Sequence, residues 1–264
     1  MSLRATHSLS STALISLTKP FTPNTLQLLR NALNHDKASS LPPVSGTPPK
    51  SRSAAVLIPF CNVGGEPSIL LEVRAKSLRS HSGEISFPGG RVDESDRSFV
   101  HAALRETQEE LGIDPSCVEI LGEIGPPEMN LRGDMRVWPF VGFVHSSNEG
   151  RPSDDEEPFP SLDVDALRLQ VSPTEVATAI HLPLKRFTTP TRIRTSMFRA
   201  SEPYWAVDVT DIVKSVLKED AVTSKTAEEE FKDEVGPGVS GRIEVWGLTG
   251  WYLSLLMKAL QVYR

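Results

Sequence analysis

Apolar residues recur along this chain in runs and spacings that predict both strands and helices. The run Ala54–Phe60 is short and almost continuously apolar, which is typical of a buried strand. A Gly64-Gly65 pair follows it, and residues 68–73 then predict the second arm of a β-hairpin. The same reasoning predicts further strands at 137–144, at 180–184, where Pro183 closes the strand, and at 204–209.

Two later segments show helical spacing. Residues 95–111 predict the clearest helix, and Ser95 or Asp96 is its expected N-terminal cap, since each offers a side-chain oxygen to free backbone N–H groups. Residues 246–260 predict an apolar closing helix. Short strands interleaved with two or three helices predict a single α+β domain.

The N-terminal segment permits two interpretations. Asn24 or Thr25 is a candidate cap for a helix whose apolar side is formed by Leu26, Leu29 and Leu33. Residues 1–35 also contain no acidic residue and are rich in serine, which is typical of a mitochondrial transit peptide. Both interpretations can hold for different parts of the segment.

Composition suggests how the chain is divided into segments and what class of protein it belongs to. We expect an N-terminal segment (1–37), a Pro/Ser-rich linker (38–53) and a domain (54–264) with charged loops near 147–165 and 218–240. The 264 residues, 39% hydrophobic and 23% charged, are typical of a globular protein. The net charge of −6 does not favour nucleic-acid binding, and no apolar run predicts a membrane span. Two distant cysteines suit a reducing intracellular compartment.

The segment 87–113, FPGGRVDESDRSFVHAALRETQEELGI, carries carboxylates in a pattern suited to a metal ion. Glu106 and Glu110 are four residues apart and share a helix face, and Glu109 follows Glu106 by three. Like charges at this spacing repel one another, and a bound hard cation relieves the repulsion. The candidate ligands are therefore Glu106, Glu110, Glu109 and the backbone carbonyl of Gly90. Taken alone, the three glutamates would equally suit a solvated surface face.

Arg105 precedes these carboxylates, and its fork-shaped guanidinium is expected to orient Glu106 or another of them. The whole segment resembles the Nudix box, G-x5-E-x7-R-E-U-x-E-E-x-G-U, where U is a bulky apolar residue. Gly90 and Arg105 are 15 positions apart, one more than in that pattern, and Asp96 stands near the first glutamate position. Thr107 is only partly apolar at its U position.

Residues upstream of the box sharpen the resemblance. The segment 70–90 is similar to the signature of the coenzyme A diphosphatase branch of the Nudix hydrolases, LLTxR(S/A)xxxRxxxGxxxFPGG. Arg74, Arg79 and Gly83 occupy their places in register, whereas Glu72 replaces the usual threonine. With further similarity downstream, the resemblance covers most of residues 53–250.

This resemblance implies a Nudix fold, with a central mixed β-sheet sandwiched between helices. It implies hydrolysis of coenzyme A or acyl-CoA, dependent on Mg²⁺ or Mn²⁺, to 4′-phosphopantetheine and adenosine 3′,5′-bisphosphate. Arg74 and Arg79 would then grip substrate phosphates. A box carboxylate, Glu109 or Glu106, or else Glu175 from a later loop, would be the general base. The alternative for Glu175 is a charge at the start of a helix after Ser172.

Two other functions remain open at this point. One is hydrolysis of another nucleoside diphosphate, such as ADP-ribose or a dinucleotide, and the other is an inactive Nudix module that binds nucleotides. The resemblance suggests peroxisomes or mitochondria, although the C-terminal Val262-Tyr263-Arg264 is not a simple peroxisomal signal and a cytoplasmic location is left open. The oligomeric state is also open, a homodimer included.

Overall fold

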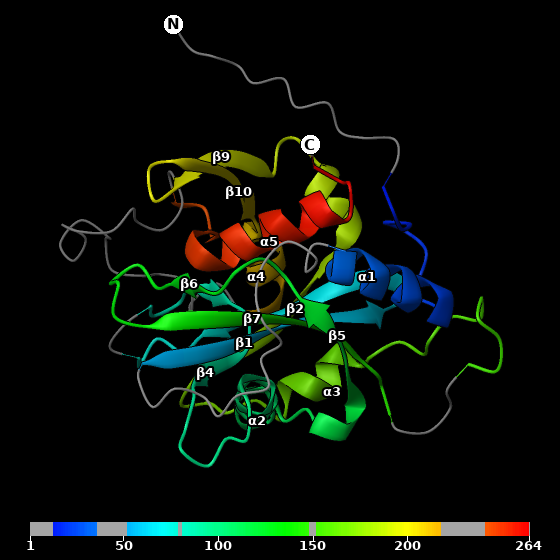
Figure 1. Cartoon of the computed structure of the whole chain (residues 1–264), viewed down its shortest axis with the longest axis horizontal. Coiled ribbons are helices and arrows are strands. Elements are labelled where there is room, and N and C mark those ends of the chain that lie inside the picture. The colour runs from blue at the N-terminus through cyan, green and yellow to red at the C-terminus, as the bar shows by residue number, and fades with distance from the viewer. Residues whose placement is uncertain (1–12, 36–51, 79–80, 148–151, 218–240, 264) are drawn as a thin grey trace, which may run out of the picture.

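The computed structural model describes residues 13–35, 52–78, 81–147, 152–217 and 241–263 (Figure 1). In chain order the elements, with η2 and η3 as short 3-10 helices, are α1 (Pro23–His35), β1 (Ser53–Val63), β2 (Glu66–Arg74), β3 (Ile85–Ser86), β4 (Gly89–Arg91), α2 (Phe99–Leu111), η2 (Pro115–Cys117), β5 (Val118–Glu123), β6 (Glu128–Met129), β7 (Arg136–Val144), α3 (Val164–Arg168), β8 (Val176–Pro183), η3 (Leu184–Thr188), β9 (Ile193–Phe198), β10 (Glu202–Asp208), α4 (Thr210–Val216), β11 (Glu244–Val245) and α5 (Gly247–Ala259).

Within the described residues, eight strands form one mixed sheet. Its central order is β3-β2-β1-β7-β5, with β4 beside β1, β6 beside β7 and β8 beside β2. Strands β1 and β7 are parallel, with Leu57 opposite Phe140, and the other paired strands of this sheet are antiparallel. A separate antiparallel sheet has the order β11-β10-β9.

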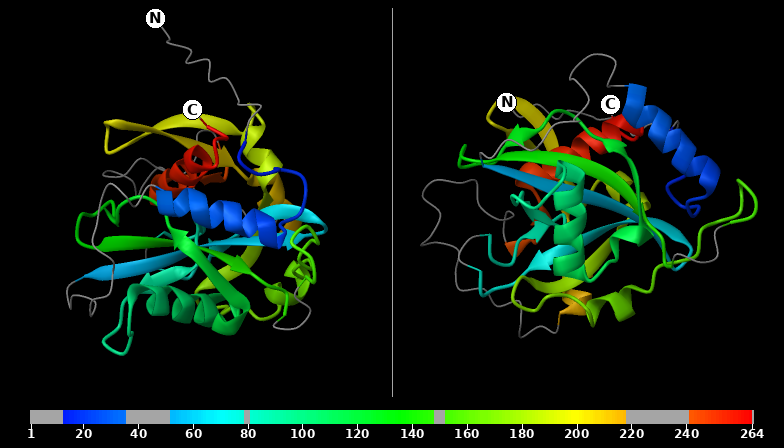
Figure 2. Two further views of the ribbon diagram at one scale, coloured as in Figure 1. Left: turned by 45° about the vertical axis from the view of Figure 1, so that its right-hand side comes forward. Right: turned by 60° about the horizontal axis from the view of Figure 1, so that its bottom comes forward.

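Side chains of β1 alternate between the two faces of the large sheet. Ile58 and Phe60 belong to the core cluster that includes residues of α1 and α5, whereas Ala55 and Leu57 pack against α2. Accordingly, α1 and α5 lie on one side of the sheet and α2 and α3 on the other (Figure 1), and the turned views of Figure 2 show the same layers. The expected α+β class, with a mixed sheet between helices, is confirmed.

The elements expected from the apolar pattern are present. β1 and β2 form the predicted hairpin, and Gly64 and Gly65 both adopt positive φ at its turn, 57° and 76°. The predicted strands at 137–144, 180–184 and 204–209 correspond to β7, β8 and β10, and the closing helix is α5. Several short elements were not expected, because each has too few residues to show a clear apolar pattern: strands β3, β4, β5, β6, β9 and β11 and helices α3 and α4.

Helix α1 confirms the helical interpretation of part of the N-terminal segment. Its buried side consists of Leu26, Leu29 and Leu33, each at most 2% exposed. The expected caps, Asn24 and Thr25, are wrong: the helix begins at Pro23, and the Thr22 hydroxyl accepts the N–H of Thr25 at 3.2 Å. A proline is well placed there, because its missing N–H is not needed in a first helical turn.

Other predicted boundaries need correction or lie beyond the described chain. β1 begins at Ser53, one residue inside the predicted linker. The loop at 147–165 is not wholly exposed, because the Phe159 ring packs 4.9 Å from the Phe143 ring and α3 begins at Val164. Residues 1–12, most of the linker and the charged loop 218–240 lie outside the described residues. Among the described helices, none is long and apolar enough to cross a membrane.

Candidate active site

Helix α2 lies on the sheet through a face of small and aromatic residues. The packed side chains are Phe99, Ala102 and Ala103 of the helix and Ala55, Leu57 and Phe140 of the sheet. The Phe99 ring also stacks on Trp138, with centroids 4.3 Å apart. Because this face is buried, the glutamates of the helix are directed along its sides, toward the turn at Pro88–Gly90 and toward solvent.

Both ends of α2 are set by its own sequence, although not by the expected cap. The Ser98 hydroxyl accepts the N–H of His101 at 3.1 Å, and the helix begins at Phe99. The expected caps, Ser95 and Asp96, are therefore wrong, since they lie before the true cap. Gly112 ends the helix in the left-handed conformation, with φ of 71°.

The glycines before the helix allow the backbone to reach the box carboxylates. A Cβ on Gly90 would lie 2.5–2.6 Å from the carboxylate atoms of Glu106. A Cβ on Gly89, whose φ is 146°, would lie 2.3 Å from the carbonyl oxygen of Ala55. The N–H of Gly89 donates to Oε2 of Glu110 at 2.7 Å. Bare backbone at these two positions therefore brings the turn against both glutamates.

Arg105 joins three carboxylates and a carbonyl in one network. Its guanidinium donates to Asp96 at 3.0 and 3.1 Å, to Glu106 at 3.0 Å, to Glu109 at 3.0 Å and to the Arg91 carbonyl at 2.9 Å. The bond to Glu106 is the contact that the sequence predicted for this arginine. Glu109, with a side chain 55% exposed, is directed toward Arg105 and solvent.

Asp96 is the buried end of this network. Burial by itself raises the pKa of the Asp96 carboxyl, but hydrogen bonds from Arg105, the Asp93 N–H and His101 outweigh it and hold the pKa below its ordinary value. The Asp96 carboxylate in turn fixes the guanidinium through two hydrogen bonds. The first carboxylate of the box therefore holds the arginine that orients Glu106, and it has no direct contact with the Pro88–Gly90 turn in the described contacts.

Glu110, Glu106 and Glu72 form a group of buried or half-buried carboxylates beside the turn. Glu110 is 5% exposed and Glu72 is fully buried. Burial raises the pKa of Glu110, and the negative charge of Glu72 raises it further. Burial is also the largest cause of the raised pKa of Glu72 and of Glu106; neighbouring glutamates raise both pKa values further, and Arg74 and Arg105 lower them without offsetting the burial. Arg105 contacts Glu106 and Arg74 lies near Glu72, whereas Glu110 forms no salt bridge with a described residue.

The two upstream arginines can be compared with expectation only in part. Arg74 lies beside this group, with Nη1 3.5 Å from Oε1 of Glu72, a distance longer than a good hydrogen bond. Its buried Nε has no hydrogen-bond partner among the described residues. The Nε–H of Arg74 is thus an unused donor, and the contact of Arg74 with a substrate phosphate stays a prediction, whereas Arg79 lies outside the described residues.

The structure brings Glu175 to the same place. The Ala75 N–H donates to the Glu175 carbonyl at 2.8 Å, and the charge of Glu175 raises the pKa of both Glu72 and Glu106. The segment is a turn, in which the Glu175 N–H donates to the Ser172 carbonyl at 3.1 Å, and it leads into β8. The alternative of a helix-start charge is therefore wrong.

These donors fit a hard divalent cation. Buried or half-buried carboxylates, next to the half-buried backbone of a glycine turn, supply the oxygen ligands that Mg²⁺ and Mn²⁺ prefer. No three acidic, histidine or cysteine side chains in the described parts of the chain are already gathered as a complete ligand set. Mg²⁺ does not require one, because it keeps several waters and is commonly held by one or two carboxylates plus substrate phosphates.

Sequence reasoning treated Glu72 only as a small departure from a signature. The signal was available, because a glutamate within the run Ile69–Val73 must be buried if the strand is. A buried carboxylate is costly unless it is paired or binds a metal, so it marks a functional group more strongly than an exposed one.

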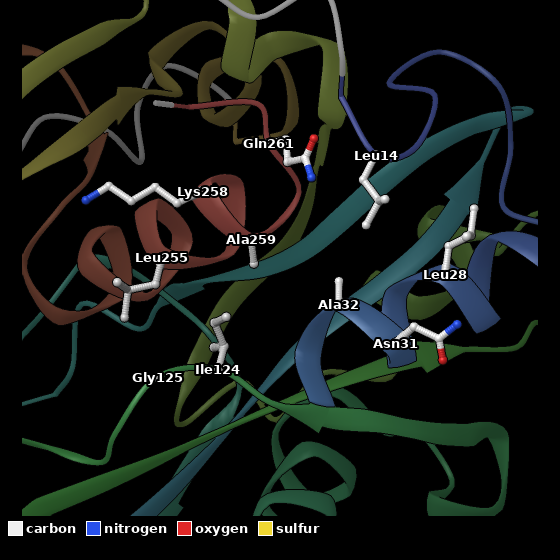
Figure 3. Close-up of a pocket in the computed structure, with 10 residues that line it drawn as sticks. All are labelled: Leu14, Leu28, Asn31, Ala32, Ile124, Gly125, Leu255, Lys258, Ala259 and Gln261. Atoms are coloured by element: carbon white, nitrogen blue, oxygen red, sulfur yellow. The ribbon is translucent and has the colours of Figure 1, made fainter. Parts of the chain in front are cut away.

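A separate cavity of about 630 Å³ lies away from the carboxylates. Figure 3 shows it between α1 and α5, lined by Leu14, Leu28, Asn31, Ala32, Ile124, Gly125, Leu255, Lys258, Ala259 and Gln261. It is on the opposite side of the sheet from α2, and its lining is largely apolar. It therefore has no part in the site on α2.

Comparison with known proteins identifies the domain type. Residues 50–189 match the family model described as the NUDIX domain. Two similar proteins, from Salmonella paratyphi B (strain ATCC BAA-1250 / SPB7) and Salmonella enteritidis PT4 (strain P125109), are each named "Uncharacterized Nudix hydrolase NudL". Each is 41% identical over 130 residues, which are 49% of this chain and 60% of the relative. The chain therefore matches less than two thirds of the length of these relatives.

Solved structures give a more distant likeness. The NUDIX domain of Shewanella oneidensis NrtR, in complex with ADP ribose, has a TM-score of 0.34 and 18% identity, over 57% of this chain and 83% of that one. A C. elegans Ap4A hydrolase has a TM-score of 0.31 and 20% identity, over 46% of this chain and 86% of that one. At this distance, the two structures say nothing about the substrate of this chain.

Proposed function

Because this chain belongs to the family of NUDIX-domain proteins, we propose that it is a divalent-metal-dependent pyrophosphohydrolase that cleaves the pyrophosphate of coenzyme A and its derivatives. The Nudix fold is shown by the family match, and Nudix enzymes generally need divalent metals such as Mg²⁺ or Mn²⁺. The observation that carries the proposal is the contact of Glu106 and Glu110 with the Gly89–Gly90 turn, in a group of carboxylates whose pKa values are raised by burial.

The choice of coenzyme A rests on the residues before the box. Arg74 and Gly83 occupy the places that the coenzyme A diphosphatase signature assigns to them, and they precede the Phe87–Gly90 turn in the same register. In the structure Arg74 lies beside the carboxylate group with an unpartnered Nε. A guanidinium in that position suits the pyrophosphate oxygens of a substrate held against the glutamates.

Each residue has a defined part in the reaction. Glu106, Glu110 and the Gly90 carbonyl would hold the cation, which neutralises phosphate oxygens and acidifies water. Arg105 holds Glu106 in place, with Asp96 holding Arg105. Water attacks one phosphorus, and the bond from that phosphorus to the bridging oxygen breaks, so one water is consumed and two phosphate monoesters are released.

A general base takes the proton from the attacking water. Glu175 and Glu109 are the candidates that the structure leaves with exposed carboxylates. Glu109 is held by Arg105, whereas Glu175 is borne on the turn before β8, close enough for its charge to act on Glu72 and Glu106. Kinetics of Glu175→Gln and Glu109→Gln across pH would separate them: only loss of the base removes the acidic limb of the kcat profile.

The test is turnover of coenzyme A, ADP-ribose and a dinucleotide with Mg²⁺ or Mn²⁺. The wild type is compared with Glu110→Gln, which keeps the side-chain shape but removes its charge, and with the exposed Glu94→Gln as matched control. We expect adenosine 3′,5′-bisphosphate from coenzyme A, a loss of kcat/KM of at least about 100-fold in Glu110→Gln, and a change of about twofold or less in Glu94→Gln.

Other results select other functions. Preference for ADP-ribose or the dinucleotide keeps pyrophosphate hydrolysis and overturns coenzyme A as substrate. No turnover by a folded protein with metal present overturns the enzymatic proposal and favours the inactive nucleotide-binding module.

A further inference from the structure

Glu72 lies in the middle of β2, in a strand that is otherwise apolar. Leu71 and Val73 belong to the core on the side of α1 and α5, whereas Leu70 packs on the other side of the sheet. Because side chains alternate along a strand, Glu72 faces the same side as Leu70, which is the side of α2. It is opposite Ser86 on β3 and is fully buried.

The two oxygens of Glu72 are in different situations. Oε1 accepts the Ser86 hydroxyl at 2.8 Å, and Arg74 approaches the same oxygen at 3.5 Å. Oε2 is buried and has no hydrogen-bond partner among the described residues. A buried carboxylate oxygen without a partner is energetically unfavourable. A ligand from outside the protein that contacts Oε2 would therefore stabilise it.

The charges around Glu72 indicate the nature of that ligand. The carboxylates of Glu110, Glu175 and Glu106 all act on Glu72 as like charges, and Arg74 is the positive charge that opposes them. These neighbours disfavour an anion as the direct partner of Oε2, and a neutral ligand would not offset their charge. A cation of charge +2 offsets that charge and satisfies Oε2.

On the basis of the proposed metal-dependent function, we propose that Glu72 is a further ligand of the divalent cation, contributing Oε2 alongside Glu106 and Glu110. The signature that this segment resembles has a threonine at the position, which carries no charge. The additional carboxylate would be a property of this chain, and it is expected to make the site bind Mn²⁺ tightly in the absence of substrate.

The competing explanation is structural. Glu72 could be a neutral side chain that only accepts a hydrogen bond from the Ser86 hydroxyl and fills space on the α2 side of the sheet. Glutamine has nearly the same shape, accepts the same hydrogen bond and has no charge, so Glu72→Gln preserves a structural role and removes a metal ligand. Glu66→Gln is the matched control, since Glu66 begins the same strand but forms an ion pair with Lys185 near the surface.

The experiment is Mn²⁺ titration of the full chain without substrate, followed by electron paramagnetic resonance of free Mn²⁺ and by the metal-induced rise in melting temperature. Glu110→Gln is titrated in parallel. We expect Glu72→Gln to bind Mn²⁺ at least about tenfold more weakly and to lose most of the metal-induced rise. Glu66→Gln is expected to match the wild type within about twofold.

The outcomes separate this inference from the proposed function. If Glu110→Gln loses Mn²⁺ affinity while Glu72→Gln keeps it, Glu72 is structural and only this inference is overturned. If the wild type binds no Mn²⁺, both the inference and the proposed metal site are overturned. If Glu72→Gln does not fold, Glu72→Thr is titrated in its place, and the same results decide.

Discussion

Replacing Arg105 tests whether the ion network on α2 holds the site together. The Asp96 side chain is fully buried and accepts two hydrogen bonds from Arg105. Removing one partner of a buried ion pair costs about 3–5 kcal/mol, whereas the contact with the half-exposed Glu109 is worth less than about 1 kcal/mol. Because the Arg105 side chain is itself 20% exposed, we expect Arg105→Met to lower the free energy of unfolding by about 3 kcal/mol.

The assay is urea unfolding without metal of the wild type, Arg105→Met, Asp96→Asn and the double variant. Since each single change breaks the same pair, we expect a coupling energy of at least about 2 kcal/mol. Lys185→Met, which breaks an exposed ion pair with Glu66, is the control and should cost less than about 1 kcal/mol. A loss below about 1 kcal/mol in Arg105→Met, or additive effects in the double variant, would mean that the pair of Asp96 and Arg105 does not stabilise the fold.

Gly90→Ala is expected to lower both Mn²⁺ affinity and kcat/KM by at least about tenfold. The reason is that the new Cβ would lie 2.5 Å from the carboxylate carbon of Glu106. An unchanged Mn²⁺ affinity in the titration would contradict this contact. Without metal, the melting temperature should fall as pH rises, because the raised pKa values of Glu72 and Glu110 mean that the folded protein binds protons which the unfolded chain releases. This stabilising contribution is complete below the ordinary pKa of 4.5 and is lost as pH rises through the pKa of Glu72 at about 7 and the higher one of Glu110. A thermal melt series should therefore show a flatter pH dependence when both are changed to glutamine, and an unchanged slope would count against the raised values. Leu29→Ala should lower the free energy of unfolding by about 2–5 kcal/mol, because Leu29 is fully buried. Leu28→Ala should lower it by less than about 1 kcal/mol, because Leu28 is 37% exposed. Equal effects of the two changes in urea unfolding would contradict the packing of α1.

Helix α2 shows how much the local sequence pattern can predict. Its spacing predicted a helix with carboxylates on one face, and the glycine turn before it predicted bare backbone close to them. The cap could not be chosen in the same way, because Ser95, Asp96 and Ser98 are all good capping residues. Ser98 is the cap in the structure, and the Asp96 carboxylate instead accepts hydrogen bonds from Arg105, which lies in a later turn of the helix.

Glu175 and Glu72 show what the local sequence pattern cannot predict. Nothing in the residues around Glu175 distinguishes a helix start from a turn, and its position beside Ala75 depends on how β8 pairs with β2. The raised pKa of Glu72 depends on its burial and on the charges of glutamates that are distant in sequence.

The long strands β1, β2 and β7, the helices α2 and α5, the carboxylates available for a cation and the arginine that orients one of them could all be predicted from the sequence. These depend on periodicity and on spacing within a single element, which are local properties of the chain. Tertiary packing alone sets which carboxylates lie together, which one faces solvent and which one has a buried oxygen without a partner. Strand register and the loss of water around each group depend on the whole fold, and they set the distances and the screening on which charge interactions depend.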